Sequence, residues 1–85
     1  MQRTGIVATI NPARAMVAIE TDDDGYTVIE LLSEFEVEVG DRMSWTNGYG
    51  LGSEVYRNLS KGTSEEVYVQ NHAVSQAALR QQLLL

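Results

Sequence analysis

The stretch from Asn47 to Gly62, NGYGLGSEVYRNLSKG, contains the residues whose types and spacing come closest to a chemical motif. Its glycines at 48, 50 and 52 could in principle surround a phosphate group. A P-loop, however, requires G-x-x-x-x-G-K-[ST], and a dinucleotide-binding loop requires G-x-G-x-x-G, each between a strand and a helix. Neither spacing occurs in this stretch. We therefore expect no nucleotide site and no cofactor.

The same stretch carries side chains suited to contacting a partner. Tyr, Trp and Arg are the residue types that most often anchor interfaces, and long connections between strands are often functional. We interpret residues 47–64 as such a connection and predict a binding loop formed by Trp45, Tyr49, Tyr56, Arg57 and Lys61. Because glycine adds backbone freedom, residues 47–52 should be more mobile than the strands. The alternative is that Tyr56 and Leu59 fold the loop back onto the protein.

Other candidate chemistry is poorly supported. Asp22, Asp23 and Asp24 are consecutive in a predicted turn, whereas an EF-hand calcium loop needs alternating oxygen ligands and a terminal Glu. His72 is the single histidine and cysteine is absent, so no zinc-binding motif exists. No serine lies in a recognisable nucleophile motif. We expect no metal site, no catalytic residue and no enzyme activity.

Length and charge limit the remaining classes. Eighty-five residues make one domain with one modest core. The net charge is −6, and residues 19–41 hold nine carboxylates and no cation. Because nucleic-acid affinity depends on clustered Lys and Arg, this composition disfavours a broad nucleic-acid surface, although residues 42–64 have three cations against one carboxylate. No apolar run is long enough for a signal-peptide core or a membrane span, which predicts a soluble, cytoplasmic protein.

Short β-type segments separated by turn signals make up most of the chain. The predicted strands are residues 4–10, 14–20, 26–32, 40–46 and 65–71, with a hairpin turn at 21–25 and a short strand or extended connection at 35–39. Closely spaced strands with no long helix between them indicate an all-β fold, either a small antiparallel barrel or a sandwich; of the barrels we favour an OB-like one, with an SH3-like barrel as the alternative. Residues 75–85 contain good helix formers, with Ser75 as a helix cap and Leu79 and Leu83 on one face.

Four segments of the chain resemble the cold-shock domain. TGIVATIN is similar to that family's first strand, TDDDG stands in the place of its P-D-D-G turn, VIELLS stands in the place of its third strand, and EVGDRMSW resembles its fourth. The resemblance implies a single OB-like domain, with a five-stranded barrel over residues 3–74 and a short C-terminal helix or ordered tail over 75–85. It also implies binding of single-stranded nucleic acid, which this family stacks on exposed aromatic side chains.

The stacking positions have lost their aromatic rings. Matched to the family, these positions are Thr9, Met16, Ala18, Ile29 and Leu31 in this chain. The last four predict an exposed apolar patch on the barrel, and such patches usually mark a covered or partner-binding surface. The C-terminal helix or a second copy of the domain could cover it. The alternative is a face assignment that is wrong by one residue, which would exchange inner and outer side chains.

Two classes of function therefore remain. The favoured class is a small non-catalytic interaction module that binds a protein partner, or itself, through the apolar patch or the binding loop. The alternative is a divergent single-stranded nucleic-acid-binding protein that uses the loop residues in place of the missing aromatic platform. We expect no membrane partner in either case.

Overall fold

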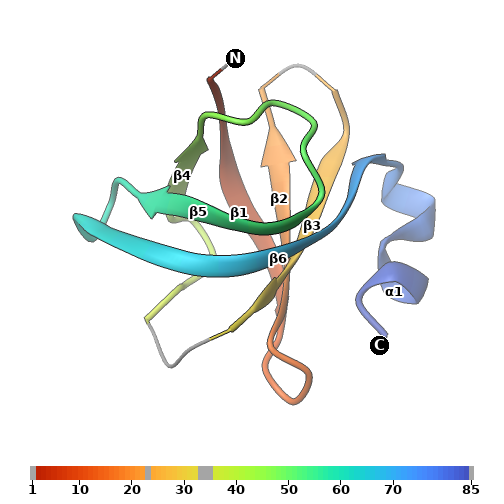
Figure 1. The fold of residues 1–85 in the computed structure, drawn as a ribbon. Coiled ribbons are helices and arrows are strands. Elements are labelled where there is room, and N and C mark those ends of the chain that lie inside the picture. Colours follow the sequence, from red (N-terminus) through yellow and green to blue (C-terminus); the bar gives the residue numbers. More distant parts are fainter. Residues whose placement is uncertain (1, 23, 33–35, 85) are drawn as a thin grey trace.

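The computed structural model describes residues 2–22, 24–32 and 36–84, which form a closed barrel of antiparallel strands (Figure 1). Around the barrel the strand order is β1-β2-β3-β6-β5-β4, and β4 pairs back with β1. The strands are β1 (Arg3–Asn11), β2 (Met16–Thr21), β3 (Tyr26–Leu31), β4 (Arg42–Trp45), β5 (Gly52–Asn58) and β6 (Thr63–Val74). The chain ends with a 3₁₀ turn, η1 (Gln76–Ala78), and a short helix, α1 (Leu79–Gln82). The predicted all-β barrel is confirmed.

The described residues form six strands, whereas the sequence predicted five. The additional strand is β5, which lies within the segment interpreted as a loop over 47–64. It pairs with β6 along its whole length, from Gly52 opposite Val69 to Asn58 opposite Thr63. The glycines made this segment look irregular, but Gly52 stands at the first position of the strand with a φ of 83°. There it turns the chain into the strand and leaves the strand interior intact.

The other predicted connections are closer to what is observed. A hairpin turn joins β2 to β3 as predicted, and the amide of Thr21 donates to the carbonyl of Gly25 at 3.0 Å. Gly25 has a φ of 62°, a conformation that glycine adopts without a steric penalty. Residues 36–39 form a connection and not a strand. Asp23 of the predicted turn and Phe35 of the predicted short strand lie outside the described residues.

The barrel interior is filled by side chains from every strand. Its buried members are Val7, Val17, Ile19, Ile29, Met43, Trp45, Tyr56, Val67 and Val69. The rings of Trp45 and Tyr56 stack with their centroids 4.5 Å apart and an interplanar angle of 3°. Strands β4 and β5 are thus joined through the core by an aromatic pair, in addition to their backbone hydrogen bonds.

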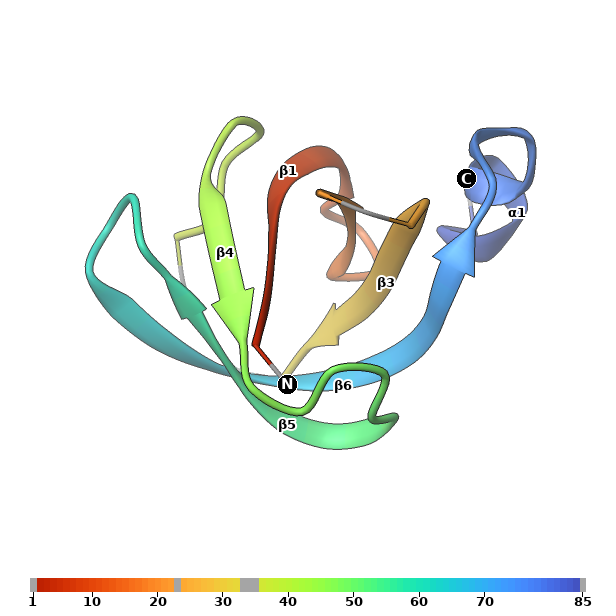
Figure 2. The same cartoon turned by 90° about the horizontal axis from the view of Figure 1, so that it is seen from above.

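A second apolar cluster lies outside the barrel, beneath the C-terminal segment. Figure 2 shows α1 beside the barrel, beyond the end of β6. The cluster consists of Met16, Ala18, Val28, Val74, Leu79 and Leu83. The side-chain amide of Asn11 donates to the carbonyl of Leu83 at 2.8 Å and helps to hold the segment in place. Across the described ranges, no helix is long and apolar enough to cross a membrane.

The predicted helix is present but shorter than expected. Regular helical structure covers only residues 76–82, and the Ser75 side chain makes no capping hydrogen bond with the described residues. Leu79 and Leu83 nevertheless share one buried face, as the sequence pattern predicted. A helix this short is not stable alone, so its apolar contacts with the barrel hold it in place.

Candidate functional site

The predicted binding loop does not form one site. Trp45 and Tyr56 were expected to be available to a partner, but they are only 2% and 1% exposed because their rings belong to the core. The Tyr56 hydroxyl is buried and has no hydrogen-bond partner among the described residues. Burial, together with the negative charge of Glu54, raises the pKa of Tyr56 well above its ordinary value. Their assignment as binding residues was therefore wrong.

Tyr49 lies at one end of the barrel, in the connection between β4 and β5. Its ring is 48% exposed and is covered on one side by the guanidinium of Arg3, 4.2 Å from the ring centroid. The edge of the His72 ring meets it with centroids 5.4 Å apart, and its hydroxyl donates to Asp24 at 3.3 Å. These contacts tie the connection to β1, β6 and the β2–β3 hairpin.

His72 reinforces the same end of the barrel. Its Nε2 donates to the carbonyl of Gly50 at 2.9 Å, which requires a proton on that nitrogen. Its Nδ1 lies 2.9 Å from the hydroxyl of Thr27. The connection is therefore folded back onto the barrel, as the alternative interpretation proposed. That alternative named Leu59, which is instead 45% exposed.

Lys61 is held in a structural ion-pair cluster. Its ammonium lies 3.2 Å from carboxylate oxygens of both Asp41 and Glu38. Burial alone would raise the pKa of Asp41, but hydrogen bonds from Asn58, from the Glu38 amide and from Lys61 lower it overall. The pKa of Lys61 is raised by its hydrogen bonds to Asp41 and Glu38. Lys61 thus fixes the β5–β6 turn against the chain that precedes β4.

The predicted apolar patch divides between two environments. Met16 and Ala18 point outward from β2 and are buried beneath Leu79 and Leu83. Of the two covers that the sequence left open, the C-terminal segment is therefore the one observed over these two residues. Ile29 and Leu31 do not belong to this surface and were assigned to it wrongly, because they pack on the barrel interior. The alternative one-residue error holds for this strand.

The pairing of β2 with β3 explains the error. Ala18 lies opposite Val28, and Val17 lies opposite Ile29. Cross-strand partners share a face of the sheet, so Val28 joins Ala18 outside the barrel while Ile29 joins Val17 inside it. The outer surface formed by Met16, Ala18 and Val28 is called the covered face below.

A different outer surface remains open. It lies on β3, β6 and β5, whose inner side chains fill the barrel. Three large apolar side chains are exposed on or beside it: Leu32 by 50%, Val55 by 57% and Tyr68 by 45%. Their backbones are adjacent. Tyr68 on β6 lies opposite Ser53 on β5, and Val55 on β5 lies opposite Glu66 on β6. The Leu32 amide donates to the Glu66 carbonyl at 3.2 Å. This surface is called the open face.

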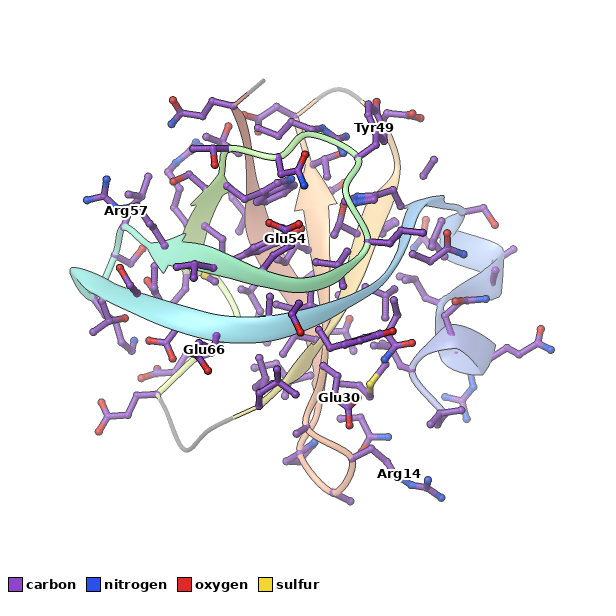
Figure 3. The ribbon with its side chains drawn as sticks, viewed as in Figure 1. Arg14, Glu30, Tyr49, Glu54, Arg57 and Glu66 are labelled. Carbon is purple, nitrogen blue, oxygen red and sulfur yellow. The ribbon has the colours of Figure 1, made fainter. Side chains whose placement is uncertain are left out.

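Charged side chains stand among these apolar groups. Glu30 lies opposite Tyr68, and Glu66 lies opposite Val55. Arg57 follows Val55 by two positions on β5 and therefore shares its outward direction. Figure 3 shows Arg57, Glu66 and Glu30 extending away from these strands. Among the described residues, none of the three forms an ion pair.

Two hollows adjoin this surface. One, of about 230 Å³, is lined by Leu32, Ser53, Glu54, Val55, Glu66 and Val67. The other, of about 240 Å³, is lined by Arg14, Met16, Glu30, Gln70, Gln82 and Leu84. In the part of the chain that the structure describes, no three His, Cys, Asp or Glu side chains gather as metal ligands would.

Leu32, Val55 and Tyr68 were missed by the sequence reasoning. In β5 the apolar residues Val55 and Tyr56 are adjacent, so alternation alone does not decide which of them points outward. The strict alternation of Val67, Tyr68 and Val69 in β6 gave the available signal, since it predicts an outward tyrosine between two buried valines.

Comparison with family models, with curated proteins and with solved structures finds no significant match to this chain.

Proposed function

We propose that this protein is a small non-catalytic interaction module that binds a protein through its open face. The observation that supports this is the group of three half-exposed apolar side chains, Leu32, Val55 and Tyr68, on adjacent strands. Contiguous apolar surface on a small domain usually marks a binding surface. The covered face of the same barrel has a cover within its own chain, whereas the open face has none among the described residues.

The composition of the open face suits a protein partner. Fully burying an exposed Val, Leu or aromatic side chain contributes about 1.5–3 kcal/mol, so three side chains that are already half-buried could contribute roughly 3 kcal/mol together. Tyr68 is of a residue type that often anchors interfaces, and the surrounding charges would select among partners by pairing or repulsion.

The same surface is poorly suited to nucleic acid. Glu30 lies directly opposite Tyr68, and Glu66 precedes Tyr68 by two positions on the same outer side of β6, so phosphates near the tyrosine ring would meet two carboxylates. Met16 and Ala18, which stand at two of the cold-shock stacking positions, lie beneath the C-terminal segment. Kinship with the cold-shock family and an OB-type barrel remain proposals, and they do not require the nucleic-acid function.

Site-specific photo-crosslinking in the cells that produce the protein would test this function. A benzophenone amino acid would replace Tyr68 on the open face and, as a matched control, Tyr49 at the barrel end. The two tyrosines are 45% and 48% exposed, so any difference reflects location and not accessibility. We expect a discrete protein adduct from position 68 that disappears when Val55→Asp is added. Absence of an adduct, or equal adducts at both positions, would exclude the proposal.

A second measurement distinguishes the two classes of ligand. Oligo-dT and oligo-U would be titrated at two salt concentrations while the amide resonances of β5 and β6 are followed by NMR. Trp45 fluorescence is a poor reporter, because that side chain is only 2% exposed. We expect no saturable shifts. Saturable, salt-sensitive shifts on the open face would favour the nucleic-acid alternative.

A further inference from the structure

We infer that the protein bound at the open face is a second copy of this chain, arranged about a two-fold axis. The inference rests on the proposed function of that face and adds the identity of the partner. Val55, Arg57 and Glu66 carry it. They give a single small surface an apolar centre and one charge of each sign.

The register of β5 and β6 fixes how these three residues are placed. Glu66 lies directly opposite Val55, and Ser64 lies opposite Arg57. Arg57 and Glu66 are therefore diagonal neighbours across the strand pair, about 7–8 Å apart at their Cα atoms. Val55 stands beside both of them and is 57% exposed, the largest exposure among the apolar side chains of the open face. In Figure 3 the Arg57 and Glu66 side chains extend from the same half of the β5–β6 ribbon.

Arg57 and Glu66 are close enough for a pair within one chain, yet the structure gives neither an ion pair among the described residues. A two-fold axis that lies in the contact plane, at right angles to the line from Arg57 to Glu66 and through its midpoint, exchanges their positions in a facing copy. Arg57 of each copy then faces Glu66 of the other. The same rotation returns Val55 close to its own position, so the two valines meet near the axis.

This arrangement is self-complementary, which is the requirement for an interface between identical copies. It contains two equivalent ion pairs around an apolar centre, and each Arg57 and Glu66 faces a charge of the opposite sign. An unrelated partner would need the complementary pattern independently, whereas a second copy has it already. The outer surface of the barrel is convex, so the contact area is small and the association is expected to be weak and reversible.

Sedimentation equilibrium from about 1 μM to about 1 mM would test the inference, because that range covers weak association. We expect the wild-type chain to form dimers. Arg57→Glu and Glu66→Arg should each weaken dimerisation on the order of a hundredfold, because each substitution creates two like-charge contacts. Both side chains are exposed, so both variants should fold, as circular dichroism would verify. Arg80→Glu and Glu20→Arg provide matched charge reversals at exposed positions elsewhere.

An equimolar mixture of the two open-face variants gives the most specific result. In a mixed dimer, the glutamate introduced at position 57 faces the arginine introduced at position 66, while the native Arg57 and Glu66 face each other at the second contact. We therefore expect the mixture to dimerise nearly as well as the wild type, although neither variant does so alone. A wild-type dimer that the two variants do not weaken, or a mixture that stays monomeric, would contradict the arrangement.

The inference and the proposed function can fail separately. A wild-type chain that is monomeric over the whole range would overturn the inference. If the benzophenone at position 68 then crosslinks to a different protein, the interaction function still stands. If it crosslinks to nothing, both fail. An adduct of twice the chain mass, absent in the Arg57→Glu variant, would support both.

Discussion

The covered face and the open face of this barrel are built alike but end in different environments. Each is the outer surface of adjacent antiparallel strands, and each presents aliphatic side chains away from the core. Met16, Ala18 and Val28 are at most 5% exposed, whereas Val55 is 57% exposed. The difference arises beyond the strands, because β6 leads directly into the segment that carries Leu79 and Leu83 over one surface. An outward apolar residue therefore stabilises the fold where another segment covers it, and is available for binding where none does.

The largest expected effect is the loss of stability when the C-terminal segment over the covered face is weakened. Leu83 is fully buried against the covered face, so Leu83→Ala should lower the free energy of unfolding by about 2–5 kcal/mol through lost burial and a cavity. Urea denaturation would measure the loss. Leu84, the next residue, is 56% exposed, and Leu84→Ala should change stability by less than about 0.5 kcal/mol. Equal effects of the two substitutions would show that the segment does not hold its place in solution.

A matched substitution on the two faces should have a smaller effect and a clear asymmetry. Val28 is fully buried and Val55 is mostly exposed, although both point outward from strands. Val28→Thr places a hydroxyl in an apolar site and should cost about 1–3 kcal/mol of stability. Val55→Thr should be nearly neutral for stability, since threonine suits exposed strand positions. Urea denaturation would again give the free energy of unfolding. A clear loss of that free energy in Val55→Thr would mean that the open face is covered.

Acid should destabilise the protein through Asp41, whose carboxylate lies 3.2 Å from the Lys61 ammonium and away from the covered face. The folded state lowers the pKa of Asp41, so this carboxylate stabilises the fold above its unfolded pKa of about 4. That contribution is lost as the pH falls through the lower, folded pKa. We expect unfolding free energy to decline below about pH 4.

The Asp41→Asn variant serves as the comparison for this pH series. It lacks the titrating group and should show a shallower decline between about pH 4 and pH 2 than the wild type. Urea midpoints measured at each pH would give both curves. Parallel curves for the two proteins would assign the acid sensitivity to other carboxylates.

The smallest expected effect is that of salt on association through the open face. Raising the ionic strength screens exposed ion pairs, so dimerisation should weaken by roughly two- to fivefold between about 0.05 M and 0.5 M NaCl. Sedimentation of the wild type would measure it. An Arg57→Met and Glu66→Met double variant should lose this dependence, because its contact is purely apolar. A wild-type dimer that strengthens with salt would argue against the two ion pairs.

The sequence predicted the barrel, the β2–β3 hairpin and the shared helix face of Leu79 and Leu83, because each rests on local signals. Alternating β-branched residues, an Asp24–Gly25 turn and a four-residue leucine spacing are all visible in single segments. Strand β5 was missed because its glycine-rich beginning resembles a loop, and its strand character depends on pairing with β6. A partner strand distant in sequence supplies hydrogen bonds that local propensity does not reveal.

The candidate site was harder to predict for a related reason. Which side of a strand faces the core is decided by the register with its neighbours, and Val28 and Ile29 are equally apolar. Only the pairing of Ala18 with Val28 assigns them to different sides of the barrel. Trp45 and Tyr56 were misassigned because aromatic rings serve interfaces and cores equally well. Their stacking with each other becomes visible only once β4 and β5 lie side by side.

The closed barrel limits how copies of this chain can associate at high concentration. Exposed strand edges present unpaired amides and carbonyls, and they are the usual template for fibril growth and for runaway aggregation. Here β4 returns to β1 and β3 bonds to β6, so the sheet formed by the described residues has no terminal strand at which another chain could be added. Molecules must meet through side chains, which gives contacts of limited number and finite assemblies.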